Sequence, residues 1–166
     1  MSDPEREATL NEWLEKYGDM IAQTCQLYLN DRMLAEDAAQ ETFIRAWRHM
    51  GQFEARNNAS AKAWLISIAI NTCRNVHRSA WFRRVDRHIT PDELPTSADM
   101  PDRTLLMMVN SLQSGLREIV LLRYFHGMNL DEAAQTLGIA RSTAYHRQQK
   151  ALRKLRIDLE GGLSDV

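Results

Sequence analysis

A group of basic side chains able to bind a charged ligand lies near the C-terminal end of the chain. Between Ile139 and Ile157 there are six lysines or arginines and no acid. A ligand responds to this local field, although the formal net charge of the whole chain is only −1. The run therefore predicts a binding site for nucleic-acid phosphates. The alternative is a solvated basic helix face.

The residues around this run have the pattern of a helix-turn-helix motif. Asn129 and Glu132 are spaced like a capping box at the start of a short helix. Ala134 is small where a second helix must cross closely, and Gly138 stands where a tight turn requires a positive φ. The next helix is expected to enter the major groove of DNA. Its polar and basic residues are Arg141, Ser142, Thr143, His146, Arg147 and Lys150.

Two positions of this predicted DNA-binding helix depart from the expected pattern. Ala140 precedes it where a capping side chain is usual, and the loss of a cap costs about 1 kcal/mol. Gln148 lies where an apolar residue would help to bury the helix.

Two earlier segments form helices with polar faces. In the first, AEDAAQETFIRAWRHM, Asp37, Gln40 and Glu41 lie on a different face from the apolar residues. This acidic face suits a protein partner with basic side chains better than it suits DNA. An ordinary solvated face explains it as well.

The second segment, AKAWLISIAINTCRNVHR, carries a polar and basic stripe opposite its apolar side. Ser67, Asn71, Arg74 and Arg78 fall at i, i+4, i+7 and i+11 of one helix. A stripe with this spacing can follow the backbone of a nucleic-acid strand. In isolation it is equally consistent with a hydrated surface.

No pattern in the sequence indicates catalysis or a cofactor. There is no glycine-rich phosphate loop, HExxH motif or nucleophile elbow, so we expect neither an enzyme nor a small-molecule substrate. Cys73 and His77, four residues apart on a helix, could share a metal ion with Cys25. Two ligands do not make a site, and we expect no metal. Both cysteines are expected to be buried as small hydrophobic residues.

The composition predicts an all-α chain of two small helical domains. No segment alternates apolar and polar residues like a strand, and three of four prolines lie between residues 91 and 101. The predicted domains are residues 5–80 and 104–160, with a flexible linker at 81–103. The start is acidic and polar, and no apolar run approaches the about 18 residues needed to span a bilayer. The chain is therefore expected to be cytoplasmic.

The predicted helices follow from apolar periodicity and capping residues. Asn30 and Asp31 end the first helix and cap the second, and Ser60 caps the third. In one helix, Leu116, Ile119, Val120 and Tyr124 share the apolar face. The predicted helices cover about 10–29, 32–50, 61–78, 105–114, 116–125, 130–137 and 141–159, with a loop at 51–60.

Three blocks together resemble the extracytoplasmic-function (ECF) sigma factors, sigma-70 members reduced to regions 2 and 4. The blocks are AEDAAQETFIRAW, AWLISIAINTCRN and LREIVLLRYFHGMNLDEAAQTLGIA, and they occur in the order of the family. The similarity covers about residues 10–158. It implies a transcription initiation factor that binds core RNA polymerase and promoter DNA. It also implies an anti-sigma factor, often membrane-bound in the family, which would hold the chain at the inner face of the membrane.

The resemblance assigns roles to matching positions. In the family, the helix containing Asp37, Gln40, Glu41 and Phe43 docks on core polymerase. The resemblance implies that the loop 52–60 matches the one that captures a flipped base of the minus-10 element, with Asn57 and Asn58 as candidates for reading it. It also implies that promoter DNA nearby is held by Ser67, Asn71, Arg74 and Arg78. The helix matching the one that binds the minus-35 element contributes Arg141, Ser142, Thr143, Tyr145, His146, Arg147 and Lys150.

The sequence RSTAYHRQQK differs from the family's usual start of this helix, a small residue with Thr-Val followed by Ser-Arg-Leu. Individual base contacts are therefore not implied. Two other functions remain open: a helix-turn-helix regulator that binds an operator, and a metal- or redox-responsive sensor built on Cys25, Cys73 and His77.

Overall fold

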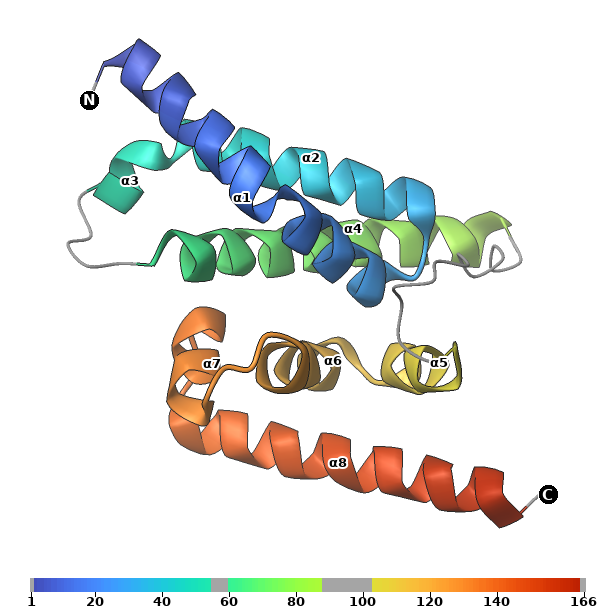
Figure 1. Ribbon diagram of the computed structural model, residues 1–166. Coiled ribbons are helices and arrows are strands. Elements are labelled where there is room, and N and C mark those ends of the chain that lie inside the picture. The colour runs from blue at the N-terminus through green and yellow to red at the C-terminus, as the bar shows by residue number, and fades with distance from the viewer. Residues whose placement is uncertain (1, 55–59, 88–102, 165–166) are drawn as a thin grey trace. The chain divides into compact units, whose positions relative to one another are not determined.

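The structure, a computed structural model, describes residues 2–54, 60–87 and 103–164. Every regular element in these ranges is a helix, which confirms the all-α prediction (Figure 1). The chain divides into two compact units, residues 1–95 and 96–166. The elements are α1 (Asp3–Leu29), α2 (Arg32–Arg48), α3 (Met50–Glu54), α4 (Ala61–Arg87), α5 (Arg103–Ser111), α6 (Ser114–Val120), the π-helix η1 (Leu121–Phe125), α7 (Leu130–Leu137) and α8 (Arg141–Ser164).

In the first unit, α1, α2 and α4 pack against one another in pairs around an apolar core (Figure 1). Ile21 and Tyr28 of α1 and Leu65 of α4 are fully buried. Each buried side chain of this size contributes about 1.5–3 kcal/mol. Cys25 and Cys73 are both fully buried, as expected.

Side-chain caps define the helix ends of this unit. Asp31 accepts a hydrogen bond from the Leu34 N–H at 3.0 Å, and Ser60 accepts one from the Ala63 N–H at 3.3 Å, which confirms both predicted caps. α1 begins earlier than predicted because Glu5 closes its first turn. The Ser2 N–H donates to the Glu5 carboxylate at 2.7 Å and lowers the pKa of that carboxyl.

The stretch predicted as a loop at 51–60 begins instead with a short helix, α3. Its residue Phe53 packs with Trp13 of α1 and Trp64 of α4, with ring centroids 5.1 and 5.2 Å away. The prediction was wrong here because this turn is held by aromatic contacts between distant residues. α4 also continues to Arg87, into the stretch predicted as linker. Asn57 and Asn58 lie outside the described residues.

The second unit departs from the prediction at Tyr124. α6 passes into the π-helix η1, where the His126 N–H donates to the Leu121 carbonyl at 3.0 Å. The wider turn shifts later side chains out of α-helical register. Tyr124 is therefore 54% exposed, whereas the α-helical pattern placed it on the buried face.

Arg117 joins α5 to α6 inside the second unit. The residue is buried, and its Nη2 donates to the carbonyls of Asn110 and Leu112 at the end of α5. A charged donor to two carbonyls satisfies groups that the helix end leaves open.

Replacing Phe53 by alanine should destabilise the first unit, because it removes the ring that packs on both tryptophans. We expect Phe53→Ala to lower the free energy of unfolding by about 2 kcal/mol. All four tryptophans lie in residues 1–95, so their fluorescence during urea unfolding follows this unit. Met33→Ala, at a side chain that is 77% exposed, should change the value by less than about 0.5 kcal/mol. Equal stability of the two variants would contradict the role of the cluster.

Candidate nucleic-acid interface

Helices α7 and α8 form the predicted helix-turn-helix. The Asn129 side chain accepts from the Glu132 N–H at 2.8 Å and starts α7. Gly138 has φ +66°, and the Ile139 N–H donates to the Ala134 carbonyl at 3.0 Å. With the bond from the Gly138 N–H to the Gln135 carbonyl, this is a Schellman motif, which suits glycine at the left-handed position.

Small residues let α8 lie close to its neighbours. Ala134 of α7 and Ala144 and Ala151 of α8 are buried, and α8 packs on both α6 and α7. At the start of α8 the Ala140 carbonyl accepts from the Ala144 N–H, with no side-chain cap from residue 140. Arg141 instead pairs with Asp131 of α7 at 2.8 Å. Both side chains are mostly exposed, so this pair contributes at most about 1 kcal/mol.

The outward face of α8 presents most of the side chains predicted to contact DNA. Tyr145 is 49% exposed, and its ring meets that of His146 edge to face at 5.8 Å. Thr143 is half-buried, as is Arg147, whose guanidinium lies where a side chain at Gly115 of α6 would reach it at 3.4 Å. The residues fully on the exposed side are Arg141, Ser142, Tyr145, His146 and Lys150.

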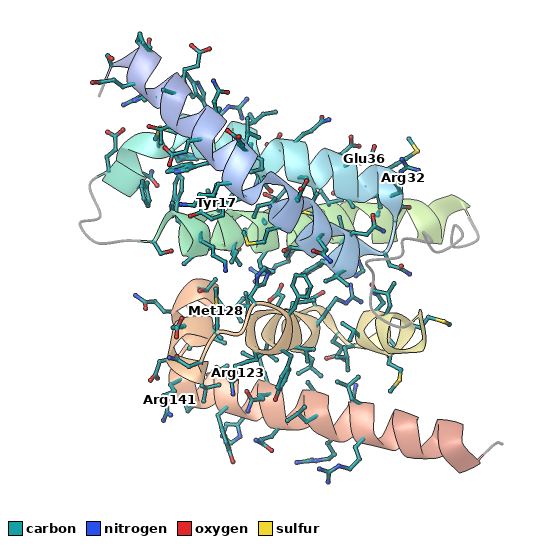
Figure 2. The ribbon with its side chains drawn as sticks, in the orientation of Figure 1. Tyr17, Arg32, Glu36, Arg123, Met128 and Arg141 are labelled. Carbon is teal, nitrogen blue, oxygen red and sulfur yellow. The ribbon has the colours of Figure 1, made fainter. Side chains whose placement is uncertain are left out.

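A polar network behind α8 was not recognised in the sequence. The Arg123 Nε donates to the Gln148 Oε1 at 2.6 Å. The Arg123 Nη1 donates to the Met128 carbonyl at 2.6 Å, and Figure 2 labels both of these residues. Gln148 therefore has a partner in the position where an apolar residue was expected. The sequence showed a glutamine on the inward face of a helix. Its partner could not be predicted from local pattern, because it lies 25 residues away.

The first unit has a second candidate surface, an open apolar groove between α1 and α2. The groove has a volume of about 580 Å³. Gln40 and Phe43 line it, Asp37 is exposed one turn earlier, and Glu41 pairs with Arg45 at 3.1 Å. Most of its lining residues were not predicted from the sequence, although apolar residues recur every four positions on both helices. The lining residues are Leu10, Leu14, Gly18, Ala39, Gln40, Phe43, Ile44 and Trp47.

The polar stripe of α4 is only partly available to a ligand. Asn71 and Arg78 are exposed, and the Arg74 Nη1 donates to the Asn71 side chain at 3.2 Å. Ser67 is half-buried, and its hydroxyl donates to the Trp64 carbonyl at 2.6 Å. Asn71, Arg74 and Arg78 are thus the better placed members of the predicted set.

Other candidate chemistry finds little structural support. Within the ranges that the structure describes, no group of three or more His, Cys, Asp or Glu side chains is placed to hold a metal ion. The His77 ring packs against Tyr28, with centroids 6.3 Å apart. None of the described helices is long and apolar enough to cross a membrane.

Comparisons with known proteins agree with this arrangement of two units. Residues 13–83 match the family described as Sigma-70 region 2, and residues 102–155 match Sigma-70, region 4. The chain is 33% identical to the ECF RNA polymerase sigma factor SigL of Mycobacterium tuberculosis, over 78% of this chain and 77% of that protein. It is 26% identical to the ECF RNA polymerase sigma factor SigX of Bacillus subtilis, over 89% and 84%.

Two solved structures share the fold. The sigma factor RpoE of Bartonella quintana, in complex with the anti-sigma factor NepR, has a TM-score of 0.76 at 21% identity and covers 90% of this chain and 96% of its own. CnrH, in complex with the cytosolic domain of CnrY, has a TM-score of 0.69 at 22% identity, with coverage of 93% and 90%. With both sigma regions matched in order and a relative at 33% identity, the chain belongs to the ECF sigma factors of the sigma-70 family.

Proposed function

We propose that this ECF sigma factor divides its work among three surfaces. The groove between α1 and α2 docks on core RNA polymerase, α4 holds the minus-10 region, and the outward face of α8 reads the minus-35 element. The observation that carries the proposal is the outward face of α8, where polar and basic side chains are exposed. The opposite face of the same helix packs through buried alanines. The activity is binding and promoter selection, with no cofactor, catalytic step or small-molecule substrate.

Recognition of the minus-35 element is supported by the distribution of side chains along α8. Ser142, Tyr145 and His146 are exposed in its first two turns, where a recognition helix meets base edges. Lys150 and, further along, Arg153 and Lys154 are exposed cations suited to phosphates. Arg141 would exchange its surface pair with Asp131 for a phosphate at little cost, because both groups are already hydrated.

Docking on core polymerase is supported by the combination of apolar and acidic groups on α1 and α2. Leu14 is 42% exposed and Ile44 is 45% exposed, both in the groove. Uncovered apolar surface of this kind marks a protein partner more often than a nucleic acid. Asp37 and Gln40 on α2 add polar groups next to it, so the partner should present apolar side chains flanked by basic ones.

The minus-10 assignment rests on the family resemblance and on the elements that flank the loop. Asn57 and Asn58 remain the proposed base-reading residues. The preceding helix α3 and the start of α4 are joined by the contact of Phe53 with Trp64, which gives the loop two anchored ends. Asn71 and Arg78, exposed on α4, are the proposed backbone contacts.

An anti-sigma factor is the proposed regulator. RpoE and CnrH, which share this fold, were solved with NepR and with the cytosolic domain of CnrY. A cytoplasmic location follows from a partnership with RNA polymerase. An operator-binding regulator would account for α7 and α8, but the match to sigma region 2 favours the polymerase partner.

Run-off transcription with core polymerase and a library of promoters tests the proposal directly. The chain should direct initiation from a subset of promoters with two shared elements. Operator-like DNA binding with no binding to core polymerase and no initiation would contradict it.

Substitutions on α8 should separate phosphate contacts from base contacts. Lys150→Ala should weaken binding of the full chain to all minus-35 duplexes alike and reduce the slope of log affinity against log salt by about 1. His146→Ala should lower discrimination at one base position, by about 1–3 kcal/mol. Lys16→Ala on α1 removes the same charge elsewhere and should leave both quantities unchanged. Titrations of labelled duplexes at several salt concentrations measure these effects, and a slope unchanged in Lys150→Ala would refute the phosphate contact.

A charge placed in the groove should prevent docking on polymerase. Leu14→Glu would bury an unpaired carboxylate against the partner, and we expect binding to core polymerase to weaken by about tenfold or more. Met33→Glu, on α2 but outside the groove, is the matched control and should bind normally. Binding is measured with labelled chain and core enzyme, and unfolding curves verify that both variants fold. Normal docking of folded Leu14→Glu would exclude the groove from the interface.

A further inference from the structure

Arg123 fixes three segments of the second unit at once. It belongs to η1, its Nε donates to Gln148 of α8, and its Nη1 donates to the carbonyl of Met128, directly before the Asn129 cap of α7. Both bonds are 2.6 Å long. The planar guanidinium holds its donors in a rigid fork, so the two acceptors are fixed relative to each other.

Over the part of α8 whose side chains are described, the inward face around Gln148 is largely apolar. Ala144 and Ala151 lie one turn before and about one turn after Gln148, and both are fully buried. Methyl groups allow a close approach, but apolar contact is non-directional and permits a small rotation or slide of the helix. A hydrogen bond weakens steeply when it is bent, so the amide of Gln148 supplies the missing angular restraint.

That restraint acts on the opposite, outward side of α8. A side-chain tip lies about 5–6 Å from the helix axis, so a rotation of about 10° moves it by about 1 Å. Such a displacement is large compared with the range of hydrogen-bond lengths that base reading tolerates. Ser142, Tyr145 and His146, the exposed residues proposed to meet base edges, all depend on this angle.

The π-helix places Arg123 for this role. The wide turn of η1 is closed by bonds from the His126 N–H to the Leu121 carbonyl and from the Met128 N–H to the Leu122 carbonyl, each 3.0 Å. π-turns in proteins frequently occur at functional sites. Here the turn ends in the connection to α7, and Arg123 reaches both that connection and α8.

We propose that Arg123 and Gln148 are positioning residues that set the rotation of α8 and thereby the base preference at the minus-35 element. The inference rests on the proposed reading of that element by α8. A merely structural role predicts something different. Loss of the acceptor of the part-buried Arg123 guanidinium would then lower stability, but base discrimination at minus-35 would stay unchanged.

Gln148→Leu in the full chain with core polymerase tests the proposal. Run-off transcription from libraries randomised at either element measures base discrimination at minus-35 and at minus-10. We expect Gln148→Leu to remain folded at the assay temperature and to keep the minus-10 preference, while discrimination at minus-35 falls by about fivefold or more. Gln149→Leu, the neighbouring position, is the matched control and should retain both preferences.

Arg123→Lys provides an independent variant, because lysine keeps the charge but lacks the fork. It should relax minus-35 discrimination like Gln148→Leu, and the double variant should be no worse than either single one, as expected for partners in one contact. Wild-type discrimination in both variants overturns the inference while leaving the proposed function intact. If the wild-type chain itself initiates without any minus-35 preference, the proposed reading by α8 fails and the inference fails with it.

Discussion

The close approach of α8 to α6 and α7 is the constraint on which the rest of the second unit depends. Ala144 and Ala151 of α8 and Ala134 of α7 are buried, and their small side chains allow the helices to approach closely. A helix packed this closely presents its remaining residues at fixed angles, because successive residues are about 100° apart. The Schellman turn at Gly138 then determines where α8 starts. The side chains on the outward face of α8 are thus placed by contacts on its inward face.

In the first unit, large side chains hold the helices in position relative to one another. Trp13, Phe53 and Trp64 join three helices through aromatic contacts, and aromatic pairs of this kind contribute about 0.5–1.5 kcal/mol beyond their burial. The core is nevertheless incomplete at the α1–α2 groove, where Leu14 and Ile44 stay half-exposed. Exposed apolar side chains at these positions do not stabilise the isolated chain. Their exposure is consistent with a surface whose final packing is completed by a partner.

Local signals predicted much of this fold, and distant contacts account for what was missed. Asp31, Ser60 and Asn129 were identified as caps because a cap needs only its own turn. By contrast, α3 depends on rings from α1 and α4, and the partner of Gln148 lies in another helix. Tyr124 was misplaced because the π-turn has no simple periodic pattern. The groove was missed because the sequence shows that its lining is apolar, but not that the helices leave it partly uncovered.

The surroundings of the α1–α2 groove and the outward face of α8 differ in the sign of their charge. Helix α1, which borders the apolar groove, holds six acids and two basic residues, whereas residues 139–157, which include most of α8, carry only cations and neutral groups. Like-charge contact penalises a wrong partner, so the groove disfavours DNA phosphates and α8 disfavours basic protein surfaces. Two tethered units that bind the same polymerase–promoter complex reinforce each other by effective concentration. The formal net charge of −1 is therefore the sum of acidic and basic segments. Each of these segments suits a different macromolecule.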